Sequence, residues 1–159
     1  MPLMHKKLFA VAALMLLAGC ATPPPREAVR ETISDANLNG TWIVKQAEFA
    51  GRALPVPPGI ELQIDGNKYV VASLTNRALP TDRGSILVFG GSAPGAGHID
   101  VLGEDGPNQG KRFPSIYRFI EASNKRELEM CYDLGGKVRP AQFESVEGTL
   151  LLRVTYARK

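Results

Sequence analysis

His98 and Asp100 are the pair whose types and spacing come nearest to a catalytic arrangement. Residues two apart on a strand share one face and lie about 7 Å apart along the chain. Together with Ser92 or Ser115 they could form a Ser-His-Asp set, but no nucleophile elbow surrounds either serine. We therefore expect no enzymatic activity and keep an enzyme that uses His98 and Asp100 as the weakest alternative.

Metal ligands are too sparse in the chain to predict a metal centre. Zinc needs three or four nitrogen or sulfur ligands, and beyond residue 20 the chain offers only His98 and Cys131, at distant positions. Glu104, Asp105 and Asn108 could supply oxygen ligands to calcium from the loop 103–108, but their spacing does not follow an EF-hand. Turn formation explains this loop more simply, and we expect no metal and no cofactor.

Cys131 is the one cysteine of the later chain, and it alternates with Glu127 and Glu129. All three residues should share one strand face, so we expect Cys131 to be partly exposed unless a bulge intervenes. Two nearby acids raise the pKa of a thiol and oppose thiolate chemistry. We interpret Cys131 as a small packing residue.

The N-terminus has the layout of an export signal. Residues 1–7 carry His5, Lys6 and Lys7 without an acid, and residues 8–17 form an unbroken apolar run. A membrane-spanning helix needs about 20 apolar residues, so this run is too short. A basic segment followed by a short apolar segment predicts a signal peptide.

Leu17-Ala18-Gly19-Cys20 closes this leader and resembles the lipobox of bacterial lipoproteins. The resemblance implies cleavage before Cys20, a diacylglycerol thioether on its sulfur and acylation, for example with palmitate, of the freed amine. Two or three acyl chains form a durable membrane anchor, whereas one chain binds only marginally. Ala21 is not the Asp that marks retention in the inner membrane, so an outer-membrane location is favoured. An ordinary signal peptide with an incidental Cys20 is the alternative.

Composition excludes a nucleic-acid-binding protein. The chain has 159 residues and a formal net charge of +3, but Lys6 and Lys7 leave with the leader, which lowers the net charge to +1. No basic run interleaved with aromatic residues remains.

We divide the chain into a signal peptide (1–19), a lipidated cysteine with a proline-rich stalk (20–37) and one domain (38–159). A helical turn or two is conceivable within 27–37, where Val29 and Ile33 form the one apolar pair.

Short runs of β-branched and aromatic residues predict an all-β domain. We expect eight strands, at 41–49, 60–65, 68–74, 84–89, 98–102, 113–121, 126–132 and 149–157. Tight-turn signals, such as Gly66-Asn67, join neighbouring strands into successive hairpins. Because closure removes unpaired edges, an eight-stranded antiparallel up-and-down β-barrel is the predicted fold, with a two-sheet β-sandwich as the alternative.

Gly40-Thr41-Trp42 opens the first long strand and resembles the Gly-Xaa-Trp start of lipocalin and other calycin barrels. In those barrels the Trp closes the floor beneath an Arg from the last strand. The resemblance implies that Arg158 stacks on Trp42; Arg153 is the weaker candidate because it alternates outward. A simple core aromatic is the alternative role of Trp42.

Several later motifs occur in an order that resembles a family of small exported domains abundant in planctomycetes. Members of this family are regarded as lipocalin-like barrels without an established activity. The resemblance covers about residues 38–159 and rests on Ile99-Asp100, Gly110-Lys111, Ile116-Tyr117, Leu128 with Cys131-Tyr132, and Arg139-Pro140-Ala141-Gln142-Phe143.

Arg139 and Pro140 fall in a glycine-containing segment, 133–143, that cannot continue a central strand. We expect a long loop at one end of the barrel, with Phe143 folded inward as a plug. Arg139 should pair with Asp100 or Asp133 beneath this loop, since structural pairing is favoured over anion binding.

We expect a membrane-anchored binding domain that takes a small apolar ligand or an envelope protein. An apolar cavity of several hundred Å³ would favour the ligand. An envelope interaction or hydrolase-inhibitor module is the alternative, with the glycine-rich loop 90–97 as its tip. A strand follows that loop instead of a helix, so it lacks the context of a phosphate-binding loop and is interpreted as a mobile loop at the barrel mouth.

Overall fold

The structure, a computed structural model, describes residues 32–90 and 96–159. The predictions for the leader, Cys20 and most of the stalk fall on residues 1–31 and lie outside the described residues. Among the residues that are described, no helix has both the length and the apolar character needed to cross a bilayer.

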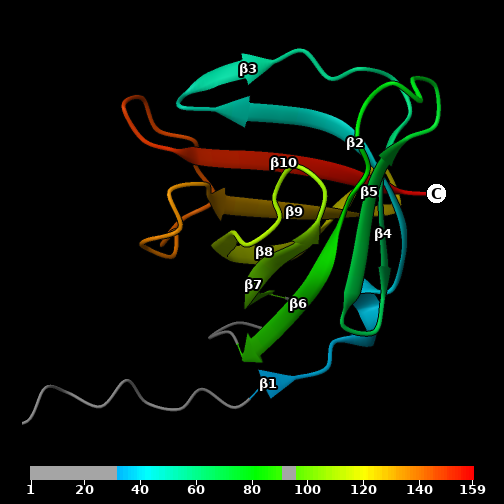
Figure 1. Ribbon diagram of the computed structural model, residues 1–159. Helices are drawn as coiled ribbons and strands as arrows, with labels where there is room; N and C mark the ends of the chain where they lie inside the picture. Colours follow the sequence, from blue (N-terminus) through cyan, green and yellow to red (C-terminus); the bar gives the residue numbers. More distant parts are fainter. Residues whose placement is uncertain (1–31, 91–95) are drawn as a thin grey trace, which may run out of the picture.

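Eight antiparallel strands of the described chain close into a barrel, and two short strands are added to it (Figure 1). Neighbouring strands pair in the order β1-β6-β5-β4-β2-β10-β9-β8-β7, and pairing of β6 with β7 completes the closure. The barrel is therefore confirmed and the open sandwich is not formed. The strands of the barrel are β2 (Gly40–Phe49), β4 (Ile60–Asp65), β5 (Lys68–Ser73), β6 (Asp82–Gly90), β7 (Ala96–Asp105), β8 (Arg112–Ala122), β9 (Lys125–Asp133) and β10 (Leu151–Arg158).

All eight predicted strands form, with ends within about three residues of their predicted positions. In β4, Leu62 and Ile64 are buried while Gln63 is exposed, as the period-two pattern requires. Asp65 pairs with Lys68, so Gly66 and Asn67 make a two-residue hairpin turn in which Gly66 has φ +58°. Local sequence thus determines most of the strand pairing.

Three short elements differ from the predictions. β1 (Thr32–Ile33) pairs with the end of β6, and β3 (Arg52–Leu54) pairs with β2; neither has a hydrophobic pattern long enough to predict a strand. Of the helical turns considered within 27–37, the described part contains one 3-10 turn, η1 (Ala36–Leu38). Asp35 caps this turn by accepting a hydrogen bond from the backbone N–H of Asn37 at 3.0 Å.

Trp42 and Arg158 close one end of the barrel, as the Gly-Xaa-Trp start implies. Trp42 is fully buried and donates its indole N–H to the carbonyl of Leu38 at 2.8 Å. The guanidinium of Arg158 lies 5.3 Å from the Trp42 ring and donates to the Asn39 carbonyl at 2.9 Å. Arg153 points to the outer face, so the choice of Arg158 is confirmed.

Gly40 and Tyr117 complete this closed end. Gly40 has φ +131°, and a Cβ there would come within 3.3 Å of the Arg158 guanidinium, so a larger residue would disturb the stacking on Trp42. Tyr117 is buried on β8 and donates its hydroxyl to Asp35 at 2.8 Å. That bond holds the segment before β2 against the barrel.

Candidate ligand-binding site

The barrel encloses a cavity of about 340 Å³. Inward-facing positions of six of its strands line the cavity with aliphatic side chains, among them Val44, Leu62, Ile64, Ile86, Ile99 and Val154. Such a volume falls in the range of about 300–1,000 Å³ that is typical of small-molecule sites. The interior is therefore large enough to hold a small molecule.

The entrance of the cavity lies at the end opposite Trp42. Residues at that end line it: Leu54 at the end of β3, the segment 55–57 that follows, Asn108 from the loop between β7 and β8, and Leu134 after β9. Leu54 and Leu134 remain 42% and 37% exposed. An apolar molecule would therefore meet apolar side chains at the rim before it enters the barrel.

Asp82 is the charged residue of the cavity wall. It opens β6 near the entrance, is 8% exposed, and accepts the hydroxyl of Tyr69 at 2.9 Å. Asn108 donates to the same carboxylate from its backbone N–H at 3.1 Å and from its side-chain amide at 3.0 Å. Burial raises the pKa of Tyr69, as do the hydrogen bond to Asp82 and the charge of Asp82, so Tyr69 stays a neutral donor.

Tyr132 and Tyr156 are the other polar residues that line the cavity. Their hydroxyls lie 2.8 Å apart, and Tyr132 also contacts the sulfur of Met130 at 3.1 Å. Burial raises the pKa of Tyr156 to about 12, even though the hydrogen bond with Tyr132 opposes the rise. The pKa of Tyr132 is raised well above its ordinary value for the same reason, so both residues are neutral at physiological pH.

His98 and Ser115 do not assemble into the catalytic arrangement considered from the sequence. His98 lies on the outer face of β7, whereas Ser115 faces the interior from β8, is fully buried, and donates its hydroxyl to the Phe113 carbonyl at 2.9 Å. The sheet therefore separates the two side chains. Ser92, the other serine considered, lies outside the described residues.

Asp100 is fully buried on the outer face of β7, and both its oxygens accept bonds from arginines. Arg139 donates to Oδ1 at 2.6 Å, and Arg112 donates to Oδ2 through Nε at 2.9 Å. Arg139 also donates to the carbonyls of Ile99 at 2.9 Å and Ser115 at 2.6 Å. The predicted pairing of Arg139 with Asp100 is confirmed, and Asp100 serves as its structural partner.

Residues 134–150, which we call the strap, run from β9 to β10 and cover part of the outer face. Arg139 and the buried Pro140 belong to the strap. At its start, Asp133 accepts the backbone N–H groups of Gly135, Lys137 and Val138 at 2.8–2.9 Å. Burial raises the pKa of Asp133, but these N–H groups together with the charge of Lys137 lower it by more.

The strap overturns two predictions. Cys131 is fully buried, because the strap covers its strand face; its thiol donates to the Glu144 carbonyl at 3.4 Å, and burial raises its pKa. Phe143 does not plug the interior, since its ring lies 4.3 Å from the guanidinium of Arg118 on the outer face. The predictions of a partly exposed Cys131 and an inward Phe143 are therefore wrong.

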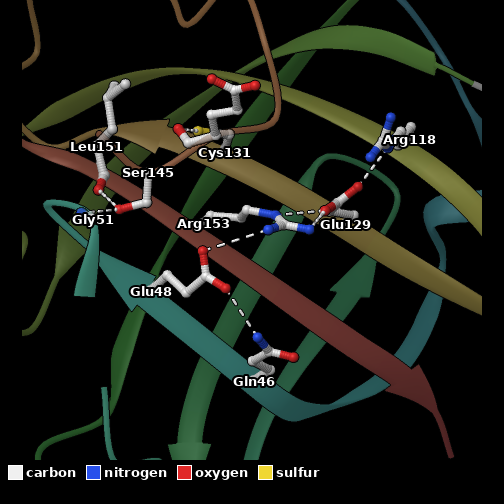
Figure 2. A network of polar contacts seen from close by, with 10 residues as sticks. Gln46, Glu48, Gly51, Arg118, Glu129, Cys131, Ser145, Leu151 and Arg153 are labelled. Atoms are coloured by element: carbon white, nitrogen blue, oxygen red, sulfur yellow. Dashed lines mark hydrogen bonds and ion pairs between the residues drawn. The ribbon is translucent and has the colours of Figure 1, made fainter. Parts of the chain in front are cut away.

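A network of charged side chains accompanies the strap on this face, and sequence reasoning missed it (Figure 2). Glu129 is fully buried and lies between Arg118 and Arg153, and Arg153 donates to it at 2.6 Å. Arg153 reaches Glu48 on β2 at 3.4 Å, while Glu127 forms a separate ion pair with Lys45. The available signal was that Glu129 lies opposite Arg118 on β8 and diagonally across from Arg153 on β10, whose direct partner is Cys131.

The acidic loop considered for calcium does not gather its oxygen ligands. Glu104 pairs with Lys68 at 2.8 Å, Asp105 pairs with Arg83 at 3.2 Å, and Asn108 bonds to the cavity residue Asp82. Within residues 32–90 and 96–159, no group of three or more His, Cys, Asp or Glu residues is arranged to hold a metal ion.

The glycine-rich segment 90–97 is described only at its two ends. It leaves β6 at Gly90 and enters β7 at Ala96, and a strand follows it as expected. Both flanking residues lie toward the end closed by Trp42, and the prediction of a mobile loop at the barrel mouth falls on residues that the structure does not describe. Residues 91–95 are outside the described chain.

The site is thus an apolar interior with one acidic residue near its entrance, and in the described part of the chain no metal-holding group of side chains accompanies it. Compared with models of protein families, with curated proteins and with solved structures, the chain matches none of them.

Proposed function

We propose that the barrel binds a small, largely apolar molecule in its interior and performs no catalysis. The single observation that carries this proposal is the cavity of about 340 Å³ with an apolar wall. A well-packed interior leaves few voids larger than a water molecule. An interior space of this size is therefore unusual for a barrel that serves only as a scaffold.

The positions of the polar groups support a binding role over a catalytic one. Asp100 is held by two arginines, and His98 and Ser115 lie on opposite faces of the sheet. Inside the cavity, Tyr132 and Tyr156 bond to each other. These groups are arranged to satisfy one another, whereas a nucleophile needs an adjacent base.

We also propose that the chain is a lipoprotein of the bacterial envelope, anchored through Cys20, with the outer membrane favoured. The support is the order of a basic segment, a short apolar segment and Leu17-Ala18-Gly19-Cys20. The motifs around Asp100 and Arg139 support a relationship to the lipocalin-like domains named above.

A pair of neighbouring valines gives a matched test of ligand binding. Val71 lines the cavity from β5, and Val70, the preceding residue, faces outward. Val71→Phe should reduce the cavity and weaken binding of a ten-carbon alcohol at least tenfold, by isothermal titration calorimetry. Val70→Phe should leave binding unchanged. If both variants bind as the parent does, or no alcohol binds the parent, the interior is not the site.

Metabolic labelling tests the anchor. Cells expressing the full chain with radiolabelled palmitate should yield a labelled product that partitions into the membrane fraction. Cys20→Ser should abolish the label, and Cys131→Ser, at the other of the two cysteines, should retain it. An unlabelled parent chain would exclude lipidation.

A further inference from the structure

We infer that the cavity selects its ligand by charge: it takes an apolar chain with a protonated amine, which binds beside Asp82. This inference rests on the proposed function and adds the chemical class of the head group. The observation that supports this inference is the position of one carboxylate near the entrance of a cavity whose other lining residues are uncharged and mostly apolar.

The wall of the cavity has a charge of one sign. Asp82 lines it, whereas none of its lining residues is Lys, Arg or His. The adjacent Arg83 points to the outer face, where it pairs with Asp105 at 3.2 Å. In the part of the chain that the structure describes, no lysine or arginine forms an ion pair with Asp82. The charge of Asp82 is therefore balanced by neutral donors alone.

Three donors in the described chain use acceptor sites of the Asp82 carboxylate. Its Oδ2 accepts Tyr69 and the Asn108 side chain, while its Oδ1 accepts the backbone N–H of Asn108. A carboxylate has about four acceptor sites, so one remains on Oδ1. An ammonium group is the donor that would use this site best, because a charge-assisted hydrogen bond is about twice as strong as a neutral one.

The volume of the cavity suits a short apolar chain attached to such a head group. Asp82 lies near the entrance, and Ile64, Ile86 and Ile99 line the interior. At about 30 Å³ for each water-sized group, 340 Å³ accommodates roughly eleven such groups. A linear amine of about ten carbons would therefore place its nitrogen at Asp82 and its chain in the barrel.

A carboxylate head is disfavoured by the same arrangement. A fatty acid would bring a second negative charge toward Asp82, and the cavity wall supplies no cation to pair with it. The neutral hydroxyls of Tyr132 and Tyr156 are bonded to each other. The cavity thus differs from one built to hold a fatty-acid anion, which needs a basic residue or a set of free donors.

A head-group series on the unchanged full-length chain tests the inference. Decylamine, decanol and decanoate share one chain length and differ in head charge at pH 7. By isothermal titration calorimetry, decylamine should bind about tenfold more tightly than decanol, and decanoate more weakly than both. If decanoate binds as tightly as decylamine, the charge selection is wrong while the proposed binding function stands. If none of the three binds, the proposed function itself fails.

Variants at two aspartates then locate the effect. Asp82→Asn should bring the affinities for decylamine and decanol to within about twofold, and Asp105→Asn, at a residue that does not line the cavity, should preserve the preference. A tenfold preference that survives Asp82→Asn would overturn the assignment to Asp82. Asp82→Asn also alters the hydrogen bonds with Asn108, so the melting temperature of each variant is measured. If Asp82→Asn does not fold, the head-group series on the parent chain still decides whether the cavity selects by charge.

Discussion

Replacing Arg139 with methionine tests the role of the strap most directly. Asp100 is fully buried, and the side chain of Arg139 is only 16% exposed, whereas that of its other partner, Arg112, is 61% exposed. Arg139→Met keeps an apolar stem of similar shape but removes the ion pair and the two hydrogen bonds to the carbonyls of Ile99 and Ser115. The carboxylate of Asp100 would then remain buried with a single, mostly exposed partner.

The expected cost follows from that uncompensated charge. Removing one partner of a buried ion pair costs about 3–5 kcal/mol of unfolding free energy. Arg112 keeps part of the compensation, so we expect about 3 kcal/mol for Arg139→Met, a large share of a stability of roughly 5–15 kcal/mol. The matched control is Arg83→Met, which breaks an exposed pair with Asp105 and should cost less than about 1 kcal/mol.

Urea unfolding provides the measurement, because Trp42 is the one tryptophan and is fully buried, so its fluorescence reports loss of the barrel. A double-mutant cycle adds Asp100→Asn, which removes the buried charge. The double variant Arg139→Met/Asp100→Asn should be more stable than the sum of the single losses predicts. Equal losses for Arg139→Met and Arg83→Met, or strictly additive losses in the cycle, would refute the reasoning.

Three further predictions concern other parts of the barrel. Gly84→Ala would place a Cβ 1.9 Å from the Leu102 carbonyl oxygen and should cost about 3 kcal/mol or more. A Cβ at Gly90 meets no atom of the described residues within 4 Å, so Gly90→Ala should change the melting temperature little. The lowered pKa of Asp133 means that its carboxylate stabilises the folded chain above about pH 4. This contribution is lost as the pH falls through the lowered pKa, and Asp133→Asn removes it at every pH. The difference from the parent in urea unfolding should therefore shrink between pH 7 and pH 2, and a constant difference would contradict it. Cys131 should resist iodoacetamide at pH 8 in the folded chain and react in urea, and rapid labelling of the folded chain would show that the strap does not cover it.

The barrel was predictable because its strands alternate with period two and are joined by recognisable turns. Leu62 and Ile64 on β4 are buried, and they stand opposite Tyr69 and Val71 of β5 with a two-residue turn between the strands. These signals are local, so a single sequence carries them. The closed end was predicted differently, from the resemblance of Gly40-Thr41-Trp42 to the start of lipocalin and other calycin barrels.

The outer face of β9 was mispredicted because its cover comes from another part of the chain. Glu127, Glu129 and Cys131 alternate as solvent-facing residues should, yet all three are buried. Arginines of neighbouring strands and the strap shield them, and no periodicity within β9 records those contacts. Phe143 was misplaced for the same reason, since an aromatic residue in a loop gives no sign of which face it will cover.

The sequence could not predict whether the barrel has a cavity; it indicated only that a cavity would favour ligand binding. The volume of the interior depends on how side chains from distant strands fill it. The residue that proved informative, Asp82, shows no motif in the sequence and lies at the start of a strand. Its position in the wall follows from the pairing of β6 with β5, where it stands opposite Val71. A buried acid of this kind is recognisable only once the register of the strands is known.

Both ends of the described chain lie at the closed end of the barrel. Thr32 pairs with Phe89 near the end of β6, and the N–H of Lys159 donates to the Thr41 carbonyl at 3.0 Å, beside Trp42. A fusion, a resin linkage or a lipid placed at either end would therefore leave the entrance unobstructed. The same arrangement allows the chain to be immobilised at either end for a binding measurement without blocking the path by which a ligand enters.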